Sequence, residues 1–239
     1  MVIESMHNPL FKELMKLKTK KGRKESGLFL VEGIHLVEEA MAHGVCEAVI
    51  STTPSSVFPK NHVLSFTLFD KLADVDSPSS ILGLCRVPTK SNPGERILLL
   101  DRIQDPGNLG TLIRSAHAFG FDTVIAEDTV DLYNAKVIRA TQGALFGLCY
   151  QEMPIEDYLK DHPELRVIGT DVKGGVGLSA APVPATPFAI ILGNEGHGVR
   201  PDLLKRSALR ITIEMDPSME SLNVGVAGSI LMYHFRKRG

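Results

Sequence analysis

The chain of 239 residues has little of what marks secreted, membrane or metal-binding proteins. It has three cysteines, Cys46, Cys85 and Cys149, which form no Cys-x-x-Cys pair and no zinc-site spacing. No apolar run reaches the roughly 18 residues expected of a membrane helix, and the charged N-terminus lacks the apolar region of a signal peptide. The sequence therefore predicts free thiols in a cytoplasmic protein that holds no metal and contacts no membrane.

The chain also lacks a large net charge of either sign. The formal net charge is −2, so bulk composition does not indicate a nucleic-acid-binding protein. The distribution is uneven, because basic residues crowd an early segment, namely Lys12, Lys16, Lys18, Lys20, Lys21, Arg23 and Lys24, and three more follow near the end, Arg236, Lys237 and Arg238. Such a cluster on a nearly neutral protein can steer it to phosphates. A lone charge run is more often a solvated helix face, and both interpretations stay open at this point.

Hydropathy patterning predicts a small N-terminal α/β domain. Apolar residues recur at helical spacing within residues 5–20, and strands are predicted at 28–31, 48–51 and 81–87, with a helix between residues 33 and 44. The run 88–94 is polar and contains two prolines and a glycine, which is typical of a domain boundary. We therefore expect one domain over residues 1–90 and a second over residues 91–239.

Strands and helices alternate in the second domain. Strands are predicted at 97–101, 123–126, 148–151, 166–170 and 188–192, and helices at 109–119 and 134–144, whereas the Gly-, Ala- and Pro-rich run 174–187 is a predicted loop. The run 188–192 is almost entirely apolar, which is typical of a strand buried on both faces of a parallel sheet. This alternation predicts an α/β domain built on a parallel sheet.

Three loops rich in glycine and asparagine follow apolar runs of this domain. The first contains Asn108 and leads into the helix that carries Arg114, the second contains Glu195, and the third contains Ser221 and Asn223. Ligands of open parallel sheets gather at the carboxyl ends of the strands, so the loops predict a pocket. None of them has the Gly-x-Gly-x-x-Gly of a dinucleotide site or the lysine of a P-loop, which argues against a nicotinamide-dependent dehydrogenase.

The third loop opens an apolar helix that carries Gly225, Ala227 and Gly228. A helix N-terminus offers unpaired N–H groups and a partial positive charge. An interior glycine costs a helix about 1 kcal/mol relative to alanine. Small residues in the first turns let another backbone or a flat ligand come close, and we interpret this end of the helix as a ligand site. From these residues alone, Ser221 could equally be an ordinary helix N-cap.

Together the three loops resemble the three motifs of the SpoU (TrmH-type) RNA 2′-O-ribose methyltransferases, which belong to the SPOUT class. The matching segments are Asn108-x-Gly110-x-x-x-Arg114 after Asp-Pro, Leu192-Gly193-Asn-Glu195-Gly196-x-Gly198, and Ser221-Leu222-Asn223-Val224-x-Val226-Ala227. In the first domain, the segments that resemble the RNA-binding module often found before this catalytic domain are Asn8-Pro-Leu-x-Lys12, Arg23 and Phe29-Leu-Val-Glu32-Gly33. The resemblance thus covers nearly the whole chain.

The resemblance implies a fold and a cofactor. The fold is a SPOUT-type parallel-sheet catalytic domain with a C-terminal trefoil knot, preceded by a small α/β RNA-binding domain, and the enzymes of this family are homodimers. The cofactor is S-adenosylmethionine, and the positions that match its contacts in the family are Thr170, Gly193, Ile213, Met215 and Leu222. Two positions depart from the family pattern, because Glu214 stands where proline is usual and Gly225 where serine is common.

The implied activity is methylation of an RNA ribose 2′-hydroxyl, with ribosomal RNA favoured over transfer RNA because of the N-terminal module. A non-catalytic RNA-binding protein on the same scaffold is the remaining alternative. Arg114 matches an arginine that binds the target phosphate and helps to deprotonate the hydroxyl. Arginine is normally always protonated, so phosphate binding is the firmer of its two roles. Asn108, Glu195, Ser221 and Asn223 are expected to orient Arg114 and the ribose. The expected RNA contacts of the first domain are Asn8, Lys12, Arg23 and Lys24.

Overall fold

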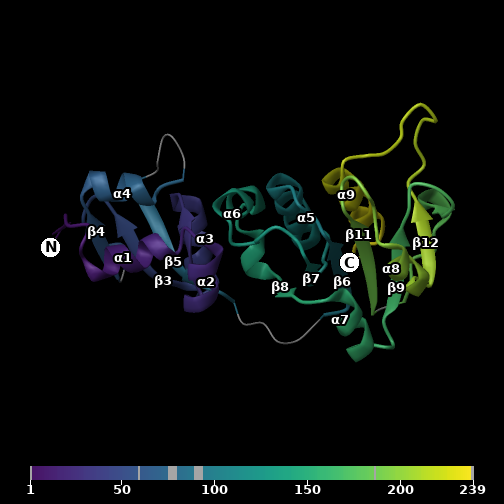
Figure 1. The fold of residues 1–239 in the computed structure, drawn as a ribbon, viewed down its shortest axis with the longest axis horizontal. Helices are drawn as coiled ribbons and strands as arrows, with labels where there is room; N and C mark the ends of the chain where they lie inside the picture. Colours follow the sequence, from purple (N-terminus) through teal and green to yellow (C-terminus); the bar gives the residue numbers. More distant parts are fainter. Residues whose placement is uncertain (1, 59, 75–79, 89–93, 186, 238–239) are drawn as a thin grey trace. The chain divides into compact units, whose positions relative to one another are not determined.

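The structure, a computed structural model, describes residues 2–237 except 59, 75–79, 89–93 and 186 (Figure 1). By contact it forms two compact units: unit 1 holds residues 1–89 and 131–146, and unit 2 holds residues 90–130 and 147–239. Most of the predicted boundary segment 88–94 lies outside the described residues, as does Arg238. The division of function at residue 90 stays a prediction, and the return of residues 131–146 to unit 1 was not anticipated.

Unit 1 is built on a five-stranded mixed sheet. Its strand order is β1 (Val2–Ile3), β4 (Asn61–Leu64), β3 (Cys46–Ser51), β5 (Ile81–Arg86) and β2 (Leu28–Glu32). Strand β3 runs parallel to β4 and antiparallel to β5. Four helices accompany the sheet, α1 (Pro9–Lys16), α2 (Lys20–Ser26), α3 (Ile34–Ala42) and α4 (Phe66–Leu72). One core cluster is formed by apolar residues of α1, α4 and the strands, among them Phe11, Leu14, Ile50 and Phe69.

Helix α2 has no apolar periodicity, and the sequence analysis did not predict it. It forms because the Thr19 hydroxyl accepts the N–H of Gly22 at its first turn and because Arg23 is buried below it. The Arg23 guanidinium donates to the Leu17 carbonyl at 2.7 Å and to the Asp131 carboxylate, with Nε 3.1 Å from Oδ2. Asp131 is the first residue of the segment 131–146, the returning segment, with which the chain comes back to unit 1. The ion pair therefore holds the returning segment against the rest of the unit.

The returning segment is part of the core of unit 1. It contains α6 (Ala135–Thr141) and a 3₁₀ turn (Ala144–Gly147). The ring of Phe29 in β2 lies 4.6 Å from that of Tyr133 and 6.4 Å from that of Phe146, measured between centroids. The chain therefore crosses between the units three times, after residues 89, 130 and 146.

Unit 2 contains a seven-stranded sheet in which every paired strand is parallel. Its order is β10 (Val176–Gly177), β12 (Leu209–Thr212), β9 (Arg166–Thr170), β11 (Phe188–Gly193), β6 (Arg96–Asp101), β7 (Thr123–Glu127) and β8 (Cys149–Glu152). The predicted parallel α/β sheet is thus confirmed. Strand β11 is central and buried throughout, as its apolar run indicated.

The described residues of unit 2 also form the helices α5 (Pro106–Ala118), α7 (Ile155–Asp161), α8 (Pro201–Arg206) and α9 (Val224–His234). The predicted loop 174–187 contains the short strand β10 and a 3₁₀ turn (Leu178–Ala180). Among the residues that the structure describes, no helix is both long enough and apolar enough to cross a membrane.

The glycines of α9 serve helix packing. A Cβ atom at Gly228 would lie 2.3 Å from Cδ2 of Leu112 in α5 and 2.6 Å from Cδ1 of Leu192 in β11, and one at Gly225 would lie 3.3 Å from Thr111 in α5. Both glycines are buried. At Gly225 and Gly228 the close neighbours are therefore α5 and β11 and not a ligand, whereas Ala227 of the same helix lines a cavity of unit 2.

Candidate active site

The three loops of the sequence analysis leave the same edge of the unit 2 sheet. The first follows β6, the second follows β11 and the third follows β12. Strands β6 and β11 are neighbours, with Asp101 paired to Gly193 at their carboxyl ends. Because all paired strands are parallel, the loops that leave these ends start at one edge, as expected for a ligand site.

The Glu195 carboxylate connects the second loop to the first. Its Oε1 accepts the side-chain N–H of Asn108 at 3.0 Å and the backbone N–H of Asp105 at 3.2 Å, and its Oε2 accepts the backbone N–H of Gln104 at 3.4 Å. Asn108 in turn accepts a hydrogen bond on Oδ1 from Nδ2 of Asn223, at 2.8 Å. The structure thus brings together three predicted site residues in one hydrogen-bonded chain across all three loops.

Two helices begin at this row of hydrogen-bonded side chains. Asn223 caps α9, since its Oδ1 accepts the N–H groups of Gly225 at 2.9 Å and Val226 at 3.2 Å. Asp105 caps α5 by accepting the N–H of Asn108 at 2.8 Å. The N-cap that the sequence left open for Ser221 therefore belongs to Asn223, and Ser221 lines the neighbouring pocket instead.

Arg114 lies apart from these contacts. It is exposed on α5, less than two helical turns after Asn108. Within the part of the chain that the structure describes, its guanidinium makes no hydrogen bond or ion pair. The side chain is consequently available to a ligand, and the structure by itself does not join it to Glu195, Asn108 and Asn223.

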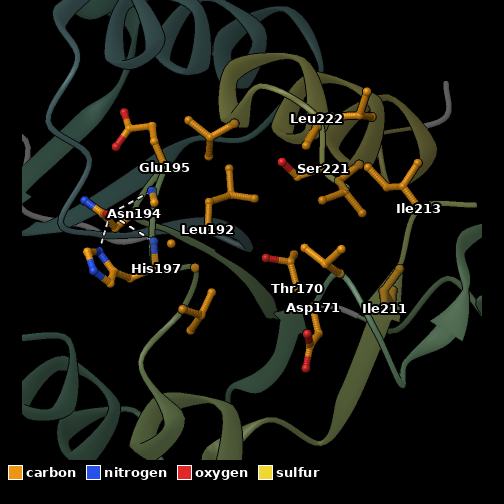
Figure 2. Close-up of a pocket in the computed structure, with 18 of the residues that line it drawn as sticks. Thr170, Asp171, Leu192, Asn194, Glu195, His197, Ile211, Ile213, Ser221 and Leu222 are labelled. Carbon is orange, nitrogen blue, oxygen red and sulfur yellow. Dashed lines mark hydrogen bonds between the residues drawn. The ribbon is translucent and has the colours of Figure 1, made fainter. Parts of the chain in front are cut away.

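A cavity of about 440 Å³ lies beside the loops, within unit 2. Figure 2 shows Asn194 and His197 on one side of it and Ser221, Leu222 and Ile213 on the other. All five residues expected to contact the cofactor line it, namely Thr170, Gly193, Ile213, Met215 and Leu222. Sequence reasoning missed other lining residues, including Asp171, Asn194, His197, Leu204 and Leu231. Asn194 and His197 stand inside the second motif, so taking that loop whole would have found them.

The second loop is folded tightly upon itself. Asn194 Oδ1 accepts the backbone N–H groups of Gly196 at 2.9 Å and His197 at 3.2 Å, and Asn194 Nδ2 donates to the carbonyl of Arg102 at 2.9 Å. A Cβ atom at Gly193 would lie 2.1 Å from the carbonyl carbon of Gly198. Glycine is therefore needed at position 193 for the loop itself, whatever the cavity holds.

The hydrogen bonds at Glu195 affect the pKa of its carboxyl group. Its burial acts to raise the pKa, but the hydrogen bonds from Asn108 and the backbone outweigh burial, so the pKa lies below its ordinary value. A lowered pKa in the folded state means that the stabilisation is present above the unfolded-state pKa and is lost as the pH falls through the folded-state value.

We expect Glu195→Gln to be less stable than the wild type at neutral pH, and the difference to shrink as the solution becomes acidic. Thermal unfolding of both proteins between about pH 3 and pH 7 would measure this. Glu38→Gln is the matched control, because Glu38 is exposed on α3 and its replacement should change the stability little. A Glu195→Gln difference that did not vary with pH would contradict the argument.

The expected RNA contacts of unit 1 have different surroundings. Lys12 and Lys24 are exposed. Asn8 caps α1, where its Oδ1 accepts the N–H groups of Leu10 and Phe11. Arg23 is buried against Asp131, with its side chain only 10% exposed. The expectation that Arg23 contacts RNA is therefore corrected: its guanidinium is committed to the core of unit 1.

No group of three or more His, Cys, Asp and Glu side chains suited to a metal ion occurs among the described residues.

Comparison with known proteins gives consistent matches over the whole length. Residues 95–233 match the SpoU rRNA Methylase family, and residues 8–83 match the MRM3-like substrate binding domain. The chain is 37% identical over 247 residues to the 23S rRNA (guanosine(2553)-2′-O)-methyltransferase RlmP of Bacillus subtilis, with 98% of each chain covered.

Solved structures of related proteins match the fold over nearly the whole chain. An AdoMet-bound rRNA methyltransferase from Sinorhizobium meliloti is 25% identical and superposes with a TM-score of 0.87, covering 98% of this chain and 97% of that one. The SpoU methyltransferase AviRb from Streptomyces viridochromogenes is 22% identical with a TM-score of 0.83, covering 96% and 97%, and it supports the fold alone.

Proposed function

The chain belongs to the SpoU rRNA methylase family, and from this membership we propose that it is an S-adenosylmethionine-dependent 2′-O-methyltransferase of ribosomal RNA. The observation that carries the proposal is the chain of hydrogen bonds from Glu195 through Asn108 to Asn223. It ties three loops together at the rim of a cavity of about 440 Å³. The network places polar side chains from three loops beside this cavity, where they can orient a ribose.

The cavity suits S-adenosylmethionine. Its volume falls within the roughly 300–1,000 Å³ typical of small-molecule pockets. Its walls combine apolar side chains with the backbone of two loops, and the residues proposed to hold the cofactor are Thr170, Gly193, Ile213, Met215 and Leu222. When bound, the cofactor supplies a methyl group on a sulfonium, which is already a good donor.

The chain's own residues have to align the ribose and assist loss of its weakly acidic proton. Alignment of reacting groups and a positioned base each lower the barrier to such a step. The Glu195 carboxylate already accepts hydrogen bonds from three donors, so we assign it to hold Asn108 and the first loop in place. Arg114 is assigned to the phosphate next to the target ribose, because its planar fork matches phosphate oxygens. The 2′-hydroxyl itself distinguishes RNA from DNA.

Ribosomal RNA is the proposed substrate class in preference to transfer RNA. The family description and the Bacillus subtilis relative both point to it. The proposal extends to a guanosine of 23S rRNA, in line with that relative. The first domain, residues 1–90, is proposed to bind the RNA through Asn8, Lys12 and Lys24, and the match of residues 8–83 to a substrate binding domain supports this role.

Turnover on purified RNA tests the proposal. The full-length protein would be incubated with S-adenosylmethionine carrying a labelled methyl group and with unmodified 23S rRNA, 16S rRNA or transfer RNA. We expect label in 23S rRNA, on a ribose 2′-oxygen, so that the phosphodiester bond on the 3′ side of that nucleotide resists alkaline hydrolysis. Label found in transfer RNA alone would contradict the proposed substrate. Label in none of the three RNAs would contradict the proposed enzymatic activity.

The proposal includes a homodimer, a trefoil knot in the C-terminal segment and a cytoplasmic location. The dimer has a physical argument of its own. On α9, Val226, Ile230 and Tyr233 are 48%, 38% and 55% exposed, and their spacing places them on one face of the helix. A closed two-fold dimer is the commonest assembly that covers such a face.

We expect Ile230→Glu to convert the dimer to a monomer, because a charge would then be buried in the interface without a partner. Light scattering at micromolar concentration gives the mass. Val57→Glu is the control, since Val57 is an exposed apolar residue of unit 1 and its replacement should leave the mass unchanged. A wild-type protein of monomer mass would refute the dimer.

A further inference from the structure

Arg102 has a backbone conformation that its residue type does not favour. It directly follows β6 and has φ of 61°, in the left-handed region. Two other non-glycine residues in the described part of the chain share this region, Asp128 and Gln142. Aspartate tolerates it, and Gln142 is the C-cap of α6, where left-handed backbone is usual. Arg102 has neither justification, so the choice of arginine at this position needs another reason.

The surroundings hold the Arg102 guanidinium in one place. Its Nε lies 3.0 Å from Oδ1 of Asp101, and its terminal nitrogen Nη2 lies 3.4 Å from Oδ2. Asp101 is fully buried. The backbone is fixed as well, because the Arg102 N–H donates to the Glu127 carbonyl and the Arg102 carbonyl accepts from Asn194, both at 2.9 Å.

Asp101 has a second charge partner besides Arg102. Arg200 donates its backbone N–H to Oδ2 of Asp101 at 2.9 Å, and its Nε lies 3.0 Å from Oδ1. Loss of one partner of a buried ion pair is costly when it leaves a charge uncompensated. Arg200 also pairs through Nη2 with the Glu127 carboxylate, so it serves two carboxylates and Arg102 shares the neutralisation of Asp101 with it. That shared role uses only Nε and Nη2 of Arg102 and leaves its Nη1 without a task.

Arg102 is placed beside the loops that carry the site. It stands two residues before Gln104, whose N–H donates to Glu195. Its side chain is 34% exposed, and it is not among the residues that line the cofactor cavity. Asp101 engages Nε and Nη2, and Nη1 makes no hydrogen bond within the described residues. Asp101 holds the Arg102 guanidinium through Nε and Nη2, so its Nη1 edge remains open to a ligand outside the cavity.

We propose that Arg102 is an RNA-binding residue that contacts a backbone phosphate close to the target ribose, an inference that rests on the proposed function. Arginine binds phosphate oxygens through paired N–H groups in a fixed plane. Asp101 holds this plane before the RNA arrives, so less side-chain freedom is lost on binding. The strained backbone is tolerated because it turns the guanidinium outward at the start of the first catalytic loop.

Arg102→Gly separates this role from a structural one through RNA binding, because a purely structural residue would leave the RNA affinity of the folded protein unchanged. Glycine adopts positive φ without strain, but the change also removes an ion-pair partner of the buried Asp101, so the melting temperature combines two opposing effects and does not decide between the roles. Its affinity for RNA should fall about tenfold, and the slope of log affinity against log salt should fall by about 0.7 to 0.9, the value for one phosphate contact. Affinity for S-adenosylhomocysteine should not change.

The RNA probes are a labelled hairpin with the 23S rRNA sequence around the guanosine 2553 of the Bacillus subtilis relative, and intact 23S rRNA. Arg166→Ala is the matched control. Arg166 is exposed at the start of β9, the opposite end of the strands from the loops, so its loss removes the same charge without affecting RNA binding. Arg102→Lys should restore the charge but only part of the affinity.

Unchanged RNA affinity would overturn the inference, whatever the melting temperature of the variant. Weaker binding of S-adenosylhomocysteine with unchanged RNA binding would assign the guanidinium to the cofactor and would also overturn it. If Arg102→Gly folds poorly, Arg102→Asn replaces it, because asparagine tolerates the left-handed region. A wild-type protein that bound neither RNA would overturn the proposed function together with this inference, whereas equal binding by wild type and variant would overturn the inference alone.

Discussion

Arg114→Ala is expected to lower the single-turnover rate of methyl transfer by at least about 10²-fold, as for loss of a general base or a charge clamp. Arg114 is exposed on α5, close to the loop that holds Asn108, and no described residue occupies its guanidinium. It does not line the cofactor cavity. Affinity for S-adenosylhomocysteine should therefore survive the change, and calorimetry on the same variant measures it.

Two further variants sharpen the result for Arg114. Arg114→Lys should not restore the rate, because lysine is a point charge that cannot reproduce the planar fork. Arg206→Ala is the control, since Arg206 is exposed in the last turn of α8 and its loss should leave the rate unchanged. Methylation by Arg114→Ala at a rate near that of the wild type would refute the assigned mechanism even if the enzyme class is right.

Gly193→Ala is expected to have the largest effect on stability. The added Cβ atom would lie 2.1 Å from both the carbonyl carbon of Gly198 and the nitrogen of Val199. These are backbone atoms, so relief requires the end of β11 or the second loop to move. Overpacking of this kind costs about 3 kcal/mol. Cofactor binding should be lost with it, as chemical denaturation and calorimetry would show.

Gly196→Ala provides the comparison for Gly193 within the same loop. Its Cβ atom would come no closer than 3.6 Å to a neighbour, the Oδ1 of Asn194, which is ordinary contact. We expect wild-type stability for this variant. Retention of full stability by Gly193→Ala would show that the loop adjusts more easily than its geometry implies. A bulky residue at position 193 is accordingly no clean test of cofactor contact, because it would damage the loop before it reached the ligand.

Elements with a strong local pattern could be predicted from the sequence. Strand β9 has the predicted bounds, and the apolar run of β11 indicated its place in the middle of a parallel sheet. Helix α2 could not be predicted, because its stability comes from Arg23 and Asp131, which are 108 residues apart in the chain. The same distance explains the error at Arg23, since local charge indicated a solvated or RNA-binding residue.

The residues proposed for the site could be named from the sequence, but the contacts between them could not. The motif residues Asn108, Glu195 and Asn223 could be named from their resemblance to a family. Their hydrogen bonds depend on how β6, β11 and α9 come together, which local sequence does not encode. The glycines of α9 show the same limit, because small residues signal a close approach without saying whether a ligand or another helix approaches.

The three crossings of the chain between its units affect any attempt to divide the protein. A single cut between residues 88 and 94 leaves residues 131–146 on the second fragment, although Val137, Ile138, Leu145 and Phe146 are buried within unit 1. The two fragments would therefore remain associated after proteolysis, and a recombinant fragment starting at residue 91 would expose those apolar side chains. The halves of this enzyme are interleaved, so exchange of the substrate-binding part with that of a relative requires transplanting residues 131–146 along with the first 89.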